Sequence, residues 1–248
     1  MILDSFRLDG RVAVVTGGNR GLGLGCATAL AEAGAEVAVL GRSGAAGAAL
    51  HVPCDLATAT PAELSAAVRT VVDELGRLDI LVNNAGIIRR DDATAVTAED
   101  WNDVLTVDLN AVWHLSQAAG RVMLDRPGGG FGGKIINVAS MLSFQGGIRV
   151  PAYAAAKHAV VGLTKALANE WAAHGVNVNA VAPGYMATDN TAALRDDPAR
   201  SAAILDRIPA ARWGTPADLA GAVVFLASDA AAYIHGTVLP VDGGWLAR

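Results

Sequence analysis

The feature that most constrains the fold is a glycine-rich turn between an apolar run and a helical segment near the start of the chain. Residues 11–16, RVAVVT, form a short β-branched run, and TGGNRGLG follows at 16–23. A helical pattern then covers 22–33. Glycines let the backbone approach a pyrophosphate closely, and the N–H groups at a helix N-terminus attract its charge. The order strand, turn, helix therefore predicts a dinucleotide-binding α/β fold.

Apolar runs alternate with helical patterns through the rest of the chain. Strands buried on both faces, which read as continuous apolar runs, are typical of parallel sheets. We predict a single Rossmann-type domain over 1–248, an α/β fold with one doubly wound, parallel, seven-stranded sheet. The six further strands are expected at 36–40, 49–54, 78–83, 134–140, 176–183 and 238–241, and further helices at 61–76, 98–124 and 152–174.

Two connections lack a helical pattern. The segment between Gly41 and Leu50 is short and broken by glycines, so we expect a loop or a single turn there rather than a crossover helix. The sequence PGGGFGG at 127–133 predicts a glycine-rich loop before the fifth strand.

Composition excludes several classes of partner. The formal net charge is -5, and no Lys/Arg cluster marks a nucleic-acid or membrane surface. No apolar run approaches the roughly 20 residues of a membrane span, so we expect a cytoplasmic protein. The two cysteines and five histidines do not form a metal-ligand pattern, and no metal is expected. A small-molecule partner is favoured.

A tyrosine and a lysine are placed to work together in proton transfer. Tyr153 and Lys157 are four positions apart at the start of a predicted helix, so they share one face. A nearby ammonium group stabilises the phenolate form of a tyrosine, which makes it a usable acid/base. Ser140 ends the preceding strand, at the edge where parallel sheets place ligands, and its hydroxyl could bond a reacting carbonyl or alcohol.

These signals together resemble the short-chain dehydrogenase/reductase family over essentially the whole chain. They are TGGNRGLG at the first turn, NNAG at 83–86, the Ser140–Tyr153–Lys157 set, and PGYMAT at 183–188. The resemblance implies hydride transfer with NAD or NADP and a homotetrameric assembly. The expected cofactor contacts are Gly17, Asn19, Arg20, Gly21, Leu22, Gly23, Arg42, Asp55, Leu56, Asn83, Ala85, Gly86, Tyr153, Lys157, Pro183, Gly184, Met186 and Thr188.

Several blocks, including loops expected around the substrate, are similar to a subgroup of that family acting on deoxy sugar acids. They imply oxidation or reduction of a hydroxyl or ketone in a molecule such as 2-dehydro-3-deoxy-D-gluconate. Three alternatives stay open: another sugar, a 3-oxoacyl thioester, or a cofactor-sensing protein with little catalysis. The blocks are MILDSF at 1–6, NNAGIIRR at 83–90, residues 134–153, 182–195, RIPAARWGTP at 207–216 and VDGGWLAR at 241–248.

Substrate contacts are expected from the loop between the catalytic serine and tyrosine. Ser140, Gln145 and Tyr153 should face the substrate, and Arg149 should grip its carboxylate with two parallel hydrogen bonds. Arg90 and Arg195 are the competing candidates, and a structural ion pair is the alternative role for Arg149. Trp171, Trp213 and Trp245 are expected to pack, although Trp245 could reach the edge of the pocket.

One position departs from the family pattern. The resemblance places a fourth catalytic residue, an asparagine, seven positions after Trp101, where this chain has Asp108. Asn110 would point to another side of the helix and is not a simple substitute. An ionised aspartate accepts hydrogen bonds but cannot donate them, which puts the expected proton relay in doubt.

Two sequence features disagree about whether the cofactor is NAD or NADP. The second predicted strand is followed by Gly41 and Arg42, and it lacks the terminal acid that selects NAD. The residues alone therefore favour NADP, whereas the subgroup resemblance favours NAD. We predict NAD as the preferred cofactor, with appreciable use of NADP.

Overall fold

The computed structural model describes residues 1–125 and 132–248. Most of the glycine-rich loop predicted at 127–133 lies outside these residues. The described chain forms one seven-stranded sheet in which every paired strand is parallel, with the order β3-β2-β1-β4-β5-β6-β7. This confirms the predicted fold class. The strands are β1 (Val12–Thr16), β2 (Glu36–Gly41), β3 (Leu50–Pro53), β4 (Ile80–Asn83), β5 (Gly133–Val138), β6 (Val176–Pro183) and β7 (Val238–Val241).

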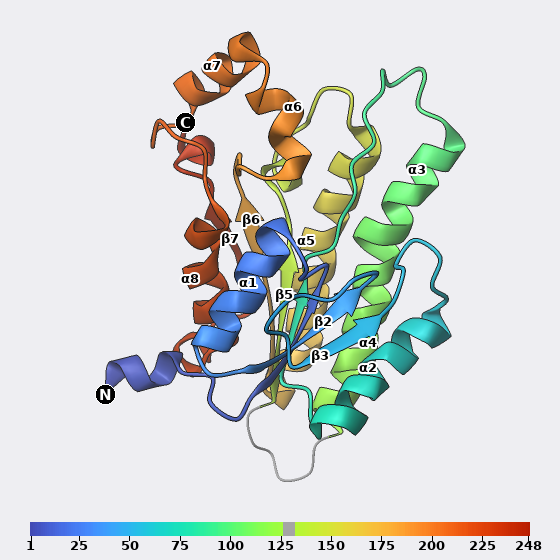
Figure 1. The fold of residues 1–248 in the computed structure, drawn as a ribbon, viewed down its shortest axis with the longest axis vertical. Helices are drawn as coiled ribbons and strands as arrows, with labels where there is room; N and C mark the ends of the chain where they lie inside the picture. Colours follow the sequence, from blue (N-terminus) through green and yellow to red (C-terminus); the bar gives the residue numbers. More distant parts are fainter. Residues whose placement is uncertain (126–131) are drawn as a thin grey trace.

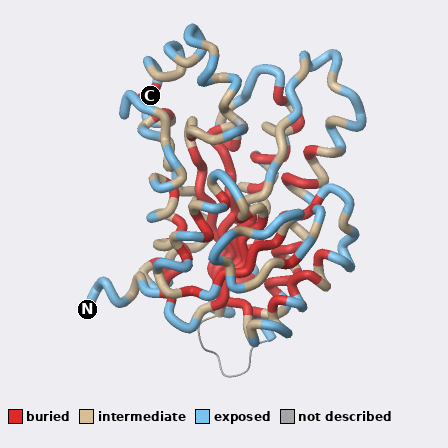
Figure 2. The backbone as a smooth tube through the Cα atoms, in the orientation of Figure 1, coloured by how far each residue is buried: buried red, intermediate tan, exposed pale blue. Residues whose placement is uncertain are grey.

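Helices cover both faces of the sheet (Figure 1). On one face, α1 (Gly21–Glu32) and α8 (Pro216–Ala227) pack on the sheet through one apolar cluster. On the other face, α2 (Pro61–Leu75), α4 (Ala111–Leu124) and α5 (Pro151–Trp171) form a second cluster. Figure 2 shows the buried backbone concentrated in the central sheet. Burial of the strands on both faces explains their continuous apolar sequence.

The helix predicted over 98–124 is divided by a π-helical turn. It begins as α3 (Ala98–Leu105), continues through a π turn at Thr106–Asn110, and resumes as α4. A π turn carries one more residue per hydrogen-bonded loop than an α-helix, so it rotates the side chains that follow. Asp108 lies in this turn and is fully buried.

The chain between β6 and β7 contains helices that the sequence patterns did not predict. They are α6 (Ala192–Arg195), α7 (Pro198–Arg207) and the crossover helix α8. The short connection between β2 and β3 is confirmed as turns and bends without a helix. Among the described helices, none combines the length and apolar character that a membrane span requires.

Candidate active site

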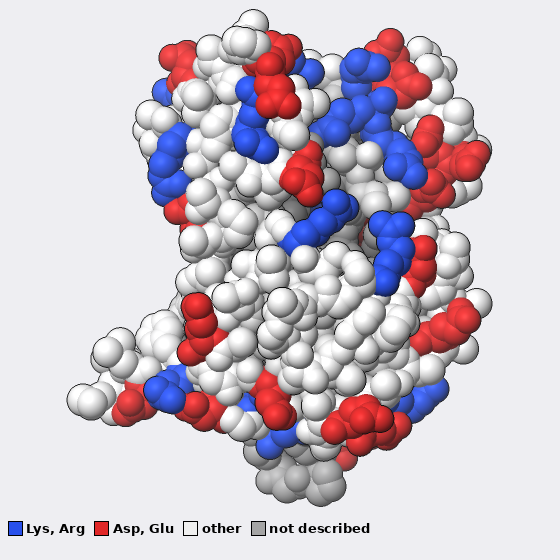
Figure 3. Space-filling view, in the orientation of Figure 1, with Lys and Arg blue, Asp and Glu red and all other residues white. Residues whose placement is uncertain are grey.

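A cavity of about 1070 Å³ opens where the strands end. Its walls come from the loops after β1, β2, β3, β4, β5 and β6, together with α7 and the C-terminal segment. The central strands β1 and β4 are neighbours, and the chain runs outward from them in opposite directions. Open α/β sheets bind ligands at such a reversal. Figure 3 shows basic side chains gathered around the hollow on this face.

The glycine turn after β1 is shaped to receive an anionic group. Gly17 and Gly21 have φ angles of 61° and 54°, a region that favours glycine. A Cβ on Gly23 would collide with the carbonyl oxygen of Gly17. Within the described residues, no side chain caps the N-terminus of α1, so its first N–H groups are available to a ligand. These features fit a dinucleotide pyrophosphate.

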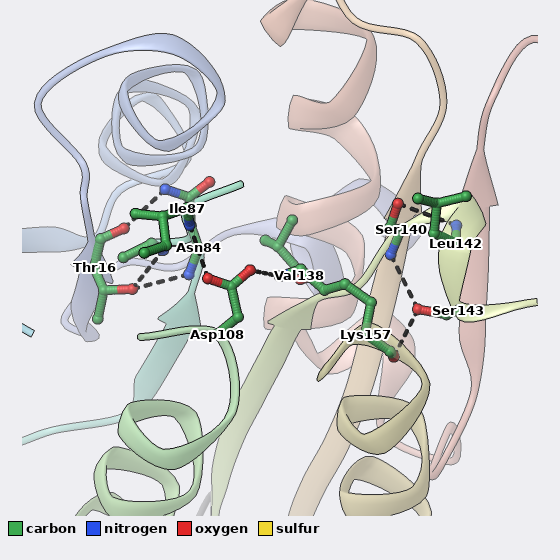
Figure 4. A network of polar contacts seen from close by, with 10 residues as sticks. Thr16, Asn84, Ile87, Asp108, Val138, Ser140, Leu142, Ser143 and Lys157 are labelled. Carbon is green, nitrogen blue, oxygen red and sulfur yellow. Dashed lines mark hydrogen bonds and ion pairs between the residues drawn. The ribbon is translucent and has the colours of Figure 1, made fainter. Parts of the chain in front are cut away.

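Thr16 ties the glycine turn to the loop after β4 (Figure 4). Its Oγ1 accepts hydrogen bonds from the N–H groups of Asn84 and Ala85, each at 2.9 Å. The side-chain amide of Asn84 donates to the Thr16 carbonyl oxygen at 2.8 Å. The two loops that line the cofactor end of the cavity are therefore held in one fixed arrangement.

Ser140, Tyr153 and Lys157 line the same cavity. Ser140 follows β5, and its N–H donates to Ser143 Oγ at 3.2 Å. That hydroxyl donates in turn to the Lys157 carbonyl oxygen at 2.7 Å, so the serine loop is fastened to α5 (Figure 4). Lys157 Nζ lies 5.5 Å from the centre of the Tyr153 ring. An ammonium group beside the tyrosine is the arrangement that acid/base catalysis requires.

Lys157 is held between a carbonyl and a buried carboxylate. Its Nζ donates to the Val138 carbonyl oxygen at 2.9 Å and lies 3.5 Å from Asp108 Oδ2. Asp108 Oδ1 accepts the Ile87 N–H at 2.7 Å. Burial raises the pKa of the Asp108 carboxyl, and Lys157 opposes that change. Burial also disfavours the Lys157 ammonium, but Asp108 and Tyr153 outweigh it and leave the pKa of Lys157 raised.

Comparisons with known proteins agree with this geometry. A family model described as enoyl-(acyl carrier protein) reductase matches residues 17–246. A relative from Escherichia coli K12, 2-dehydro-3-deoxy-D-gluconate 5-dehydrogenase, is 52% identical, and the alignment covers 100% of both chains. The chain belongs to the short-chain dehydrogenase/reductase family. The 2-dehydro-3-deoxy-D-gluconate 5-dehydrogenase of Bacillus subtilis is 50% identical to this chain, over 99% of this chain and 98% of the relative.

Solved structures of the family superimpose closely on the chain. A protein from Agrobacterium tumefaciens with bound NADP has a TM-score of 0.90 and 51% identity, covering 98% of this chain and 99% of its own. Gluconate 5-dehydrogenase from Burkholderia cenocepacia, in complex with NADP and tartrate, has a TM-score of 0.94 and 42% identity over 100% of both chains. As a family member, this chain is an NAD(P)-dependent oxidoreductase.

The structure brings most of the expected site residues of this short-chain dehydrogenase/reductase to one cavity. Asp108 is the exception among the catalytic candidates, since it lies behind Lys157 rather than in the wall. The expected residues in the cavity wall are Gly17, Asn19, Arg20, Gly21, Leu22, Gly23, Arg42, Asp55, Leu56, Ala85, Gly86, Ser140, Gln145, Tyr153, Lys157, Pro183, Gly184, Met186 and Thr188.

The structure places two expected contacts, Asn83 and Arg149, outside the cavity wall. Asn83 is buried, and its amide donates to Ser116 Oγ at 3.0 Å and Asn137 Oδ1 at 2.9 Å. Its neighbour Asn84 lines the cavity instead. The assignment of Asn83 to the cofactor is corrected accordingly, because adjacent residues at a strand end face opposite sides.

Arg149 does not belong to the described cavity wall. Its Nε lies 3.2 Å from Asp92 Oδ1, and its Nη2 lies 3.9 Å from Asp91 Oδ1. Its φ angle of 65° turns the backbone into the left-handed region. The alternative role, a structural ion pair, describes this residue better than the carboxylate clamp. Arg195 donates to the Thr188 carbonyl oxygen at 3.2 Å, whereas Arg90 lines the cavity.

Sequence reasoning missed part of the wall at the end remote from the glycine turn. Tyr185, Arg200 and Arg207 line this end. Trp245 also lines it, which is the alternative that the sequence offered for this residue. The available signal was the pair of blocks RIPAARWGTP and VDGGWLAR, but nothing in their spacing showed that they meet.

Proposed function

We propose that this enzyme transfers a hydride between NAD(P) and a hydroxyl or ketone of a deoxy sugar acid such as 2-dehydro-3-deoxy-D-gluconate. The observation that carries the proposal is the Tyr153–Lys157 pair in the same cavity as the glycine turn. The substrate class is supported by the names of the relatives that are 52%, 51% and 50% identical along nearly the whole chain.

The residues present fit a bound dinucleotide. Gly17, Gly21 and Gly23 would hold the pyrophosphate, and Asp55 and Leu56 would flank the adenine. Tyr153, Lys157 and Thr188 would hold the nicotinamide end. When bound, the nicotinamide ring supplies the hydride acceptor in oxidation and the hydride donor in reduction.

Tyr153 handles the proton in this proposal. In the oxidative direction its phenolate oxygen takes the proton of the substrate hydroxyl, while the C–H electron pair leaves as hydride and a C=O bond forms. In reduction the Tyr153 hydroxyl returns that proton to the oxygen. Lys157 stabilises the phenolate, and the Ser140 hydroxyl orients the substrate and donates to the developing oxyanion.

We propose that both dinucleotides are used, with NAD preferred as the sequence resemblance implies. Arg42 supports the use of NADP, because it lines the cavity directly after β2, where an arginine can accommodate a 2′-phosphate. Asn19 Nδ2 donates to Ser43 Oγ at 2.8 Å, which links the glycine turn to the loop that carries Arg42. The ratio of kcat/KM for NADH and NADPH measures the preference, and an NADPH advantage above about tenfold would contradict it.

The proposed function is tested with a panel of substrates and both reduced cofactors, following absorbance of the nicotinamide. We expect turnover of keto sugar acids by the wild-type enzyme. Tyr153→Phe should reduce this turnover by at least about a hundredfold while the dinucleotide still binds, because general acid–base catalysis contributes roughly that much. Near-normal turnover by this variant would remove Tyr153 from the mechanism.

The panel also includes 3-oxoacyl thioesters, since a 3-oxoacyl-[acyl-carrier-protein] reductase from Vibrio harveyi is 42% identical over 96% of this chain. A preference for a thioester or a neutral sugar would contradict the proposed substrate class. No turnover of any carbonyl compound would favour the cofactor-sensing alternative.

A further inference from the structure

We infer that Arg207 binds the carboxylate of the sugar-acid substrate, with its guanidinium over the ring of Trp245. The inference rests on the proposed function and names the residue that would recognise the acid group. It replaces Arg149, which the structure engages with Asp91 and Asp92.

Arg207 is placed at the remote end of the catalytic cavity by helix α7. Arg200, Ile204 and Arg207 recur at helical spacing, so they share one face of α7. Arg200 and Arg207 line the cavity that contains Ser140 and Tyr153. Ile204 packs against the apolar cluster of Met141, Ile208 and Trp245. Because Met141 directly follows Ser140, this cluster connects the α7 face to the serine loop.

The guanidinium of Arg207 lies over an aromatic ring. Its central carbon is 4.0 Å from the centre of the Trp245 ring. Trp245 is only 5% exposed, and Tyr185 packs against it with ring centres 4.8 Å apart. Stacking uses the face of a guanidinium and leaves its N–H edge available, which is the part that binds a carboxylate with two hydrogen bonds.

The chain terminus fixes this arrangement. Arg248 donates to the carbonyl oxygens of Asp206 and Arg207, at 2.6 Å and 3.2 Å, and so binds the end of α7 to the C-terminal segment. Asp242 accepts hydrogen bonds from the N–H groups of Gly244 and Leu246, each at 2.9 Å, which shapes the turn before and after Trp245. These contacts fix the backbone of Arg207 through Arg248 and the backbone around Trp245 through Asp242.

Charge distinguishes Arg207 from other arginines of the wall. Arg20 is paired with Asp189, and Arg89 with Asp100 and Asp103. Within the described residues, the side chain of Arg207 has no carboxylate partner, and its guanidinium contacts the Trp245 ring. A substrate carboxylate would supply the missing negative charge. Arg200 also lacks a carboxylate partner among these residues, but it has no ring beneath it.

The test uses binding, so it does not depend on turnover. Affinities of D-gluconate and of D-glucitol, its neutral counterpart with a hydroxymethyl group, are measured for the enzyme with NADP⁺. Arg207→Met, which can still pack on Trp245, should weaken gluconate binding by about ten- to a hundredfold, the range expected for a hydrogen-bonded charge pair. Glucitol binding and NADP⁺ affinity should not change. Arg207→Lys should give an intermediate loss.

Arg200→Met is the matched comparison, because it removes the same group from the same helix face. We expect it to change gluconate binding less than about threefold, since no ring orients that guanidinium. Equal gluconate affinity in wild type and a folded Arg207→Met protein would overturn the inference, as would an equal loss for glucitol. Failure of the proposed function would instead appear as a wild-type enzyme that turns over no sugar acid.

Discussion

At the scale of single residues, the carboxylate behind the catalytic lysine distinguishes this chain. Asp108 is buried in the π turn, accepts the Ile87 N–H, and lies 3.5 Å from Lys157 Nζ. The family pattern has an asparagine here, which is neutral. An ionised carboxylate at this distance offsets part of the positive charge that Lys157 presents to Tyr153. Asp108 is thus a positioning residue that sets the electrostatics of the pair.

This account predicts a change in the pH profile of Asp108→Asn. Asp108 opposes the effect of burial on Lys157 and helps to keep its pKa raised, so removing the carboxylate should lower that pKa. We expect the high-pH limb of kcat/KM for alcohol oxidation, where Lys157 loses its proton, to move to lower pH, with each unit worth about 1.4 kcal/mol. The pH profile measures this, and Glu99→Gln, at an exposed carboxylate of α3 outside the cavity wall, is the control.

A shift of the limb to higher pH, or a loss of rate without any shift, would contradict this account. The second result would mean that Asp108 acts through local structure. Unchanged NAD(P) affinity in both variants confirms that the cofactor end of the cavity remains intact.

Sequence predicted the types of chemistry better than the directions of side chains. Ser140, Tyr153 and Lys157 follow from strand ends and helical spacing, and the structure places them in one cavity. Asn83 could not be separated from Asn84 by the same reasoning, since one residue decides which side of the strand faces the ligand. The carboxylate clamp and the ion pair proposed for Arg149 could not be separated by sequence, because Asp91 and Asp92 lie far away along the chain.

At the scale of elements, burial decided which patterns could be recognised. The central strands are apolar on both faces, and that sequence signature is distinctive. Helix α8 is apolar almost all round, so its helical period is hidden, although Thr215 and Asp218 form a capping box at its start. The π turn between α3 and α4 was not predicted, because a single turn of this kind leaves no repeating pattern in the sequence.

The pairing of β5 with β6 carries a buried lysine that links stability to pH. Lys134 of β5 is 2% exposed, and its Nζ donates to Asn177 Oδ1 of β6 at 2.9 Å. Burial lowers the pKa of Lys134 to about 8 from its usual 10.5, with Asp229 opposing this change and Arg11 adding to it. Above about pH 8 the folded chain releases the proton, whereas the unfolded chain keeps it until about pH 10.5.

The sign of this linkage gives a prediction. Between about pH 8 and 10.5 the unfolded state binds more protons, so Lys134 makes the free energy of unfolding rise with pH, by up to about 1.4 kcal/mol per unit. In Lys134→Met this contribution is absent. Urea unfolding at several pH values should therefore show wild type gaining stability relative to this variant as pH increases.

Lys165→Met, at an exposed position of α5, serves as the control and should keep the wild-type pH dependence. Parallel curves for wild type and Lys134→Met would show that Lys134 does not link folding to protons. A relative loss of wild-type stability on raising the pH would reverse the sign that burial requires.

At the scale of the whole molecule, one helix presents an exposed face suited to a second copy of the chain. Ala155, His158, Gly162 and Ala166 recur at helical spacing along α5, and all are exposed in the single chain. A Cβ on Gly162 would have no atom within 4 Å. Small side chains allow helices to approach closely, and symmetric assemblies bury the same face of each copy.

We therefore expect the homotetramer that the family resemblance implies, with α5 in one of its interfaces. Light scattering after size-exclusion chromatography should give about four times the chain mass of 25.2 kDa. Gly162→Arg should lower the mass, because the isolated chain accommodates this side chain and a closely packed helix pair does not. Thr70→Arg, on the exposed side of α2, should leave the mass unchanged. A wild-type monomer would contradict the assembly, and a Gly162→Arg protein of wild-type mass would remove α5 from the interface.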